Sequence, residues 1–395
     1  MAAVPAVPAA LRRLVPGRRQ PPVEVGVTTA APADTAADQT SPAPPARRRW
    51  PAAVLVGGAA LWLAFTAAHL VLSGRWWLWL AVDTVPPPAF LLVPLVLGVG
   101  AAVSRRRRTV ALLAAVGLLL GAGLSGVNIR WWQGGDGEPP VDALRVFSWN
   151  TGYWDSGGET EELYRVLRDA DADVYLLQEY WYERGRPTEA TLDRLRAEFP
   201  GFQVVVLGEL VTLSRVPVLR QVPVEPVGLP PAVAEAGDEW RYKTLRTDLD
   251  VGGGRVLSAY NVHLPVQISP EHGLLDGDFY RIMRGQHAQR EPQWRALARD
   301  VRDNPHPVLL AGDLNTTPAM GDLRKLPDGL RDASYAMPSL YPASWAHRPG
   351  WPYGWRLDWA FVSPQVRVHS YHFGDGRGAS DHRPQQLSVS LPGRN

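Results

Sequence analysis

VLLAGDLNTTP, at residues 308–318, joins a short apolar run to two polar side chains. The run has the character of a buried strand, ends at Gly312, and is followed by Asp313 and, two positions later, by Asn315. Because successive side chains of a strand point to opposite faces, Asp313 and Asn315 should leave its carboxyl end on the same side. This strand end is therefore a candidate functional position.

Polar side chains of the same kind recur at other predicted strand ends. FSWN ends with Asn150, LLQE with Glu179 and NVH with His263. DWAFV begins with Asp358, and Asp381 and His382 precede the last strand. Turn formation alone does not account for so many such positions. Carboxylate and amide oxygens without thiols suit Mg²⁺ or Mn²⁺. Together with a carboxylate that activates water and a histidine that transfers protons, such a cation indicates hydrolysis of a phosphate ester.

Each residue also has a simpler interpretation when it is taken alone. Asn150 could form a turn at a strand end, and Glu179 could be a surface charge at a sheet edge. Asp313 and Asn315 could cap the segment that follows them. His263 could be a hydrogen-bonded polar residue without a catalytic role. Convergence of these side chains in space would favour the catalytic interpretation over all of these.

The order of the predicted elements after residue 142 indicates an α/β domain built on layered sheets. Strands are predicted at residues 144–149, 173–178, 202–207, 241–249, 255–263, 307–311, 357–362 and 386–391. Helices are predicted at residues 159–170, 188–199 and 286–301. The Val- and Pro-rich residues 217–231 indicate an irregular edge or a loop.

Composition divides the chain into four parts. These are a disordered tail at residues 1–49, a membrane domain at residues 50–130, a Gly- and Pro-rich linker at residues 131–142 and a catalytic domain at residues 143–395. The tail is mostly Ala, Pro, Val and Arg, which offers too few large apolar side chains to offset the entropy of ordering it.

The membrane domain is predicted from three apolar segments, at residues 52–73, about 84–103 and 109–127. Each approaches the ~20 residues that a helix rising ~1.5 Å per residue needs to cross ~30 Å of hydrocarbon. Three prolines at residues 86–88 stand near the start of the middle segment, where a first helical turn tolerates them. Three buried helices of a soluble domain are the alternative. A cleaved signal peptide fits less well, because the first segment starts far from Met1 and two more follow.

Basic residues beside the three segments predict their orientation. Arginines at residues 47–49 and 105–108 flank one side, whereas the other flanks hold only Arg75 and Arg130. Because basic residues stay on the cytoplasmic side, the tail and the four-arginine loop should be cytoplasmic and everything after residue 127 should lie outside. Five tryptophans would then fall at the outer interface, where indole rings prefer to lie: Trp76, Trp77, Trp79, Trp131 and Trp132.

Composition also limits the chemistry. The chain has no cysteine, which excludes disulfides and thiolate metal sites. From residue 145 onward it carries 28 Lys or Arg and 32 Asp or Glu, a formal net charge of −4. This part has no basic run of the kind that nonspecific nucleic-acid binders use, which disfavours nucleic acid as the substrate without excluding it.

The motifs together resemble those of the endonuclease/exonuclease/phosphatase superfamily, the deoxyribonuclease I-like proteins. WN, LLQE, NVHL, AGDLNTTP, RLDWAFVSP and SDHRP occur in the order and approximate spacing of that family. The resemblance covers residues 143–391 and none of the membrane part. It implies a four-layer α/β sandwich, in which two packed mixed sheets are flanked by helices, here preceded by about three transmembrane helices.

The resemblance also implies a role for each residue. Glu179 would be the principal metal ligand, with Asn150 and Asp381 nearby. The remaining residues would act on water and phosphate: Asp313 orients or activates water, Asn315 and His263 contact the phosphoryl oxygens, and His382 is an acid or base that Asp358 positions. No position of the motifs is missing, so an inactive copy of the fold is not indicated.

These inferences predict a hydrolase of phosphoric esters that depends on Mg²⁺ or Mn²⁺. The protein would be anchored in the cell membrane by several spans, with its catalytic domain outside the cytoplasm. A noncatalytic binding or scaffold module with the same fold is the alternative. Phospholipid, sugar phosphate and nucleic acid all stay open as substrates, and no protein partner is evident. The loop at residues 264–285 could contact substrate or membrane, or could pack on the core.

Overall fold

The computed structural model describes residues 52–153, 160–180, 189–268, 272–273, 275–347 and 351–392, so the predicted tail lies outside the described residues. The α-helices are α1 (Ala52–Leu72), α2 (Ala89–Ala101), α3 (Arg107–Gly121), α4 (Thr160–Ala170), α5 (Glu189–Glu198), α6 (Pro231–Ala234), α7 (Asp238–Arg241) and α8 (Gly277–Asp303). Short 3₁₀ helices are η1 (Trp77–Thr84), η2 (Ala122–Leu124), η4 (Gly321–Lys325) and η5 (Ala333–Ala336).

Strands from both halves of residues 144–390 form two sheets. The first has the order β11-β12-β1-β2-β4-β3 and the second the order β5-β6-β7-β8-β10-β9. The strands of the first are β1 (Leu144–Asn150), β2 (Val174–Gln178), β3 (Gln203–Leu207), β4 (Leu210–Ser214), β11 (Arg367–Phe373) and β12 (Gln385–Ser390). Those of the second are β5 (Val218–Pro223), β6 (Thr244–Asp250), β7 (Val256–His263), β8 (Val308–Asp313), β9 (Arg331–Asp332) and β10 (Asp358–Val362).

Both sheets are mixed, because each contains one parallel pair among antiparallel neighbours. In the first sheet β1 runs parallel to β2, and in the second β7 runs parallel to β8. The carboxyl ends of parallel neighbours meet at one edge of a sheet, so Asn150 and Gln178 lie opposite each other, as do His263 and Asp313. These two pairs place polar side chains where the sheets end.

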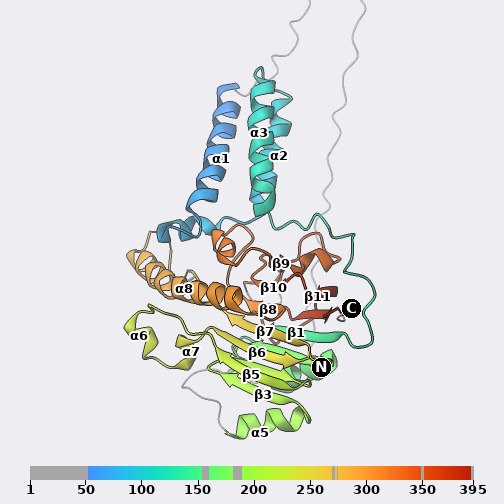
Figure 1. The fold of residues 1–395 in the computed structure, drawn as a ribbon. Coiled ribbons are helices and arrows are strands. Elements are labelled where there is room, and N and C mark those ends of the chain that lie inside the picture. Colours follow the sequence, from blue (N-terminus) through green and yellow to red (C-terminus); the bar gives the residue numbers. More distant parts are fainter. Residues whose placement is uncertain are drawn as a thin grey trace, which may run out of the picture. The chain divides into compact units, whose positions relative to one another are not determined.

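The two sheets pack face to face through one apolar core. Val146 and Leu176 of the first sheet join Ala259 and Leu309 of the second in a single buried cluster. Side chains of α4 and α5 pack on the outer face of the first sheet. Helix α8 covers the outer face of the second sheet (Figure 1). This arrangement confirms the predicted four-layer sandwich of two mixed sheets flanked by helices.

The predicted start of the last helix was wrong for an identifiable reason. Helix α8 begins at Gly277 rather than at residue 286, because Phe279 and Met283 lie one turn apart and are both buried against η1. These two side chains of the loop predicted at 264–285 therefore pack on a neighbouring element. The Val- and Pro-rich segment contains β5, which lies at a sheet edge where proline is tolerated.

The apolar segments near the start form three helices that run side by side (Figure 1). By length and composition two could cross a membrane, Ala52–Leu72 and Arg107–Leu124. The predicted middle span, at about 84–103, holds α2, which begins directly after the proline run, and only the last residue of η1. Helices η1 and α2 are bent by 61° at the break that holds these prolines. The middle segment counts as a third span only if this bent pair is taken as one, because α2 alone is 13 residues long, shorter than the ~20 residues a span needs.

Gly312 is required where β8 passes β7. Its φ is +148°, a conformation that side-chain-bearing residues rarely adopt. A Cβ at this position would lie 1.9 Å from the backbone oxygen of Val262. The glycine in VLLAGDLNTTP therefore permits the close approach of two backbones directly before Asp313.

Replacement of Gly312 by alanine should destabilise the fold strongly, because backbone atoms of Val262 cannot move away without breaking the β7–β8 pairing. We expect Gly312→Ala to lower the free energy of unfolding by about 4 kcal/mol or more. Gly254 is the matched control, since its φ is +69° and a Cβ there meets nothing within 4 Å. Gly254→Ala should cost only the backbone strain of about 1–2 kcal/mol.

Urea unfolding of the full chain in detergent, followed by tryptophan fluorescence, measures both variants. Equal losses in the two would contradict the assignment of Gly312 as a steric requirement.

Candidate functional site

Asp313 lies at the centre of the polar residues that the strand ends bring together. Its Oδ2 accepts a hydrogen bond from Asn150 Nδ2 at 3.0 Å, and the same Nδ2 donates to Glu179 Oε1 at 3.2 Å. Asn315 donates from its backbone nitrogen to Asp313 Oδ1 at 2.8 Å and from Nδ2 to the Leu264 oxygen at 2.9 Å. Residues far apart in the chain thus converge on one buried carboxylate.

Two of these side chains owe their position to left-handed backbone. Glu179 has a φ of 48° and directly follows the end of β2. Asn315 has a φ of 45° and lies just after the end of β8 at Asp313. Non-glycine residues adopt this conformation at a cost, which surrounding contacts must offset. The chain therefore turns sharply at both positions and directs the side chains toward the same site.

His382 and Asp358 form a buried pair beside Asp313. His382 Nδ1 lies 2.8 Å from Asp358 Oδ2, and His382 Nε2 lies 3.6 Å from Asp313 Oδ2. Burial lowers the pKa of His382, but the negative charges of Asp358 and Asp313 outweigh it, so this pKa is raised. Burial and the charge of Asp358 raise the pKa of Asp313 in spite of the opposing effect of His382. A proton donor and a proton acceptor therefore lie side by side.

His263 is held between two carboxylates. Its Nε2 lies 3.2 Å from Glu179 Oε1 and its Nδ1 lies 2.7 Å from Glu209 Oε1. Burial opposes the charged form of His263, but Glu209 and Glu179 favour it, and the pKa of His263 is raised. Burial raises the pKa of Glu179 while His263 lowers it, with a lowered pKa as the result. The imidazole is thus fixed as a cation beside the other polar groups.

Sequence reasoning missed Glu209 and Lys243. Glu209 is 3% exposed and is contacted by the Lys243 ammonium and, at 3.0 Å, by the Tyr153 hydroxyl. It follows Gly208 in the short connection between β3 and β4, a position that normally faces solvent. Burial raises the pKa of Glu209, but Lys243 and His263 lower it further than burial raises it. Nothing local in the sequence indicates this burial, because it depends on strands of both sheets.

Asp381 lies slightly apart from the other predicted residues. Its Oδ2 accepts a hydrogen bond from Trp345 Nε1 at 2.8 Å. It lines the same cavity, of about 640 Å³, as Glu179, His263 and His382. Asp313 and Asn315 also line this cavity, whereas Asn150 and Asp358 support it from behind. All eight predicted residues therefore belong to one neighbourhood.

The residues present fit a hard divalent cation. Ligand atoms of Asp313, Asp358 and His382 lie within 4.8 Å of one another. Asp358 Oδ1 is buried and has no hydrogen-bond partner among the described residues. The Glu179 carboxylate offers further oxygen ligand atoms nearby. The Asn150 amide turns Nδ2 toward Glu179, and its Oδ1 accepts a hydrogen bond from the Gly152 backbone nitrogen. Carboxylate and amide oxygens are the donors such a cation prefers.

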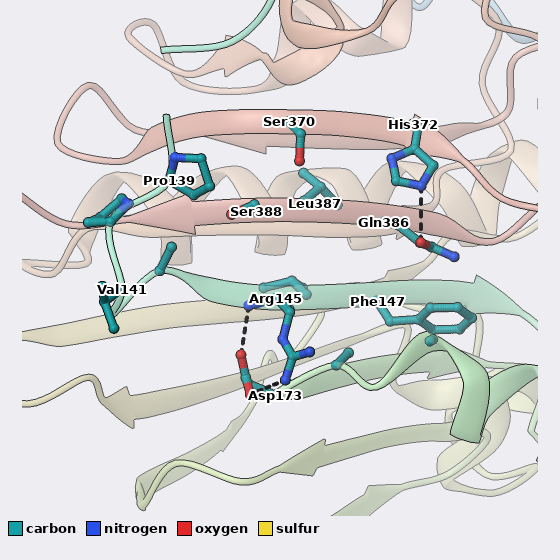
Figure 2. Close-up of a pocket in the computed structure, with 15 residues that line it drawn as sticks. Pro139, Val141, Arg145, Phe147, Asp173, Ser370, His372, Gln386, Leu387 and Ser388 are labelled. Carbon is teal, nitrogen blue, oxygen red and sulfur yellow. Dashed lines mark hydrogen bonds and ion pairs between the residues drawn. The ribbon is translucent and has the colours of Figure 1, made fainter. Parts of the chain in front are cut away.

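A second hollow, of about 560 Å³, lies at the outer face of the first sheet beside the linker (Figure 2). Its charged groups are already paired, since Arg145 contacts Asp173, and His372 lies 3.0 Å from Gln386 (Figure 2). Its lining contains none of the eight residues that the sequence predicts for the site. The cavity around Asp313 is therefore the candidate site.

Residues 147–382 match the sequence profile of the "Endonuclease/Exonuclease/phosphatase family". Among curated proteins no sequence matches. Similar solved structures include an endonuclease/exonuclease/phosphatase from Bacteroides vulgatus, at 16% identity over 63% of this chain and 99% of that chain, with a TM-score of 0.46. A protein so described from Beutenbergia cavernae has 23% identity over 64% and 72%, with a TM-score of 0.45. An AP endonuclease from Archaeoglobus fulgidus has 16% identity over 63% and 99%, with a TM-score of 0.46.

The Asp358 carboxylate should control the charge of His382. In Asp358→Asn the burial that lowers the pKa of His382 persists while its largest opposing charge is lost, so this pKa should fall, although Asp313 still raises it. A smaller fraction of the imidazole would then be charged at a given pH. Titration of the histidine Cε1–H signals by NMR in EDTA-treated protein measures the change.

Asp328→Asn is the control, because Asp328 is exposed and does not line the cavity. A His382 pKa that is the same in both variants would contradict the assignment of the pair.

Proposed function

Because the chain belongs to the endonuclease/exonuclease/phosphatase family, whose members hydrolyse phosphoric ester bonds, we propose that it is a membrane-anchored, Mg²⁺-dependent hydrolase of such esters. The active site is the cavity around Asp313, and it faces outward from the cytoplasm. One observation carries this proposal: acids, amides and imidazoles from both sheets converge on a single cavity. A scaffold that retained only the fold would have no need of this convergence.

The residues divide the reaction between them. Asp313, with its raised pKa, orients the attacking water and accepts its proton. The water oxygen forms a bond to phosphorus as the ester P–O bond breaks. His382, charged and held by Asp358, donates a proton to the leaving oxygen. Asn315 and the charged His263 hydrogen-bond the phosphoryl oxygens, on which negative charge increases in the transition state.

Glu179 and Asn150 are the proposed ligands of the cation, with Asp381 close by on the cavity wall. A bound Mg²⁺ or Mn²⁺ polarises the phosphoryl group and stabilises charge on the leaving oxygen. Glu209 and Lys243 act indirectly, because Glu209 holds His263 in place and charged and Lys243 pairs with Glu209. The loss of either should therefore affect the phosphate contact of His263.

Removal of the water-activating or proton-donating group should abolish most of the activity. With a generic soluble phosphodiester such as bis(p-nitrophenyl) phosphate and Mg²⁺, we expect Asp313→Ala and His382→Ala each to lower kcat by about 10²- to 10⁴-fold. EDTA should have a comparable effect, reversed by added Mg²⁺. Steady-state kinetics of the full chain in detergent measures these changes.

Asp328→Ala serves as the surface control and should leave the rate unaltered. Undiminished turnover in both active-site variants would support the noncatalytic module instead.

The proposed topology can be tested because the chain has no cysteine of its own. Leu219→Cys, on the catalytic domain, and Val103→Cys, beside the four-arginine loop, are both exposed positions. In intact cells a membrane-impermeant maleimide should label Leu219→Cys, and should label Val103→Cys only after the membrane is permeabilised. The reverse pattern would place the site in the cytoplasm.

A further inference from the structure

The candidate cavity is not built by the catalytic domain alone. Asp83 and Thr84, the last residues of η1, line it together with Glu179, Asp313 and His382. Helix η1 connects the first apolar helix to α2, so part of the cavity wall belongs to the membrane domain. Any substrate in the cavity would contact this wall.

The membrane domain is fixed to the segment that follows Asp313. The Ser73 hydroxyl donates to Asp83 Oδ1 at 2.7 Å and accepts from the Gly321 backbone nitrogen at 2.7 Å. Arg324 donates to the Ser73 backbone oxygen at 2.8 Å, and a ring nitrogen of His69 lies 2.8 Å from the Ala319 oxygen. A Cβ on Gly321 would lie 2.0 Å from that Ser73 oxygen, which shows how closely the two backbones approach. The end of α1, η1 and residues 319–324 therefore form one packed unit.

Part of the cavity wall lies close in the chain to the predicted membrane surface. Trp76 lies between α1 and η1, and Trp131 and Trp132 begin the linker that follows α3 and η2; they are 46%, 44% and 65% exposed. Exposed indole rings mark the headgroup level of a bilayer. Thr84 stands only five positions before the start of α2 at Ala89. The wall formed by η1 is thus at the height of lipid headgroups.

Apolar and aromatic side chains form much of the remaining wall: Trp240, Pro265, Val266, Ile268, Trp345, Trp355 and Leu357. Trp240 and Val266 are 53% and 42% exposed, so this surface continues to the rim. Lys243 is the one Lys or Arg among the described residues of the lining, and it is paired with Glu209. A nucleic-acid backbone needs several basic contacts, whereas an amphiphile needs an apolar wall.

Three buried polar atoms of the lining have no hydrogen-bond partner among the described residues. They are Asp83 Oδ2, Gln267 Oε1 and Thr317 Oγ1. Buried polar atoms are costly when unpaired. Each of these oxygens can accept a hydrogen bond, so together they suit a ligand group that carries hydroxyl or ammonium donors.

We propose that the substrate is a phosphate ester of a membrane lipid whose headgroup carries hydrogen-bond donors. The inference rests on the proposed function and specifies its substrate class. The headgroup reaches the catalytic residues past Asp83 and Thr84. The apolar side chains at the edge of the cavity, which include Trp240 and Val266, contact the adjoining part of the lipid. Water adds to phosphorus, the ester P–O bond breaks, and the leaving oxygen departs as a hydroxyl group.

The rates of hydrolysis of a lipid and of a soluble phosphodiester test the substrate class separately from the hydrolase function. The full chain is reconstituted into phosphatidylcholine vesicles with or without phosphatidylglycerol, and its turnover of bis(p-nitrophenyl) phosphate is measured in parallel. Phosphatidylglycerol, which has hydroxyl donors, should be hydrolysed at least about tenfold faster than phosphatidylcholine, which has none. Phosphorus NMR of the products measures both rates.

A matched pair of variants tests the rim. Val266→Asp should lower the ratio of lipid to soluble turnover by about tenfold or more, because a charge replaces apolar contact. Val227→Asp makes the same change at a position that is 66% exposed and outside the lining, and should leave the ratio unchanged.

Equal loss of both activities in Val266→Asp, or faster cleavage of a DNA oligonucleotide than of either lipid, would overturn the lipid assignment while the hydrolase function stands. Failure to hydrolyse any of these substrates with Mg²⁺ would instead overturn the proposed function.

Discussion

A carboxylate buried between two sheets is the constraint on which the site depends. Asp313 is 1% exposed, and an isolated charge at such a position would be prohibitively costly. It is tolerated because Asn150, Asn315 and His382 surround it with donors and positive charge. Those partners can reach it only where the parallel strand pairs of both sheets end together. The chemistry of the site therefore depends on how the two sheets pack.

Much of this arrangement can be predicted from the sequence because it is local. Strand period places Asp313 and Asn315 at one strand end, and polar residues after apolar runs identify Glu179 and His263 in the same way. The order of the motifs then predicts the layered fold. Glu209 could not be found by such reasoning, because a residue in a short hairpin connection becomes buried only through tertiary contacts with His263 and Lys243.

Other boundaries depend equally on distant contacts. The extra turns of α8 form because Phe279 and Met283 meet η1, an element nearly 200 residues earlier in the chain. The proline run at residues 86–88 predicts a helix start, and α2 does begin at Ala89. The run also lies at the break where η1 and α2 are bent by 61°, which the local sequence does not indicate. Helix η1 packs against α8. Local patterns identify such segments but do not identify their neighbours.

The hydrogen bond that the Gly321 backbone nitrogen donates to Ser73 connects α1 to the catalytic half of the chain. Bilayers that are thinner or thicker change the tilt of the helices that cross them. With α1 as a membrane span, such a tilt would act on the segment that follows Asp313 in the chain. Lipid composition would then affect the site as pH or salt does. A fragment without its helices would lose both this sensitivity and one side of the cavity wall.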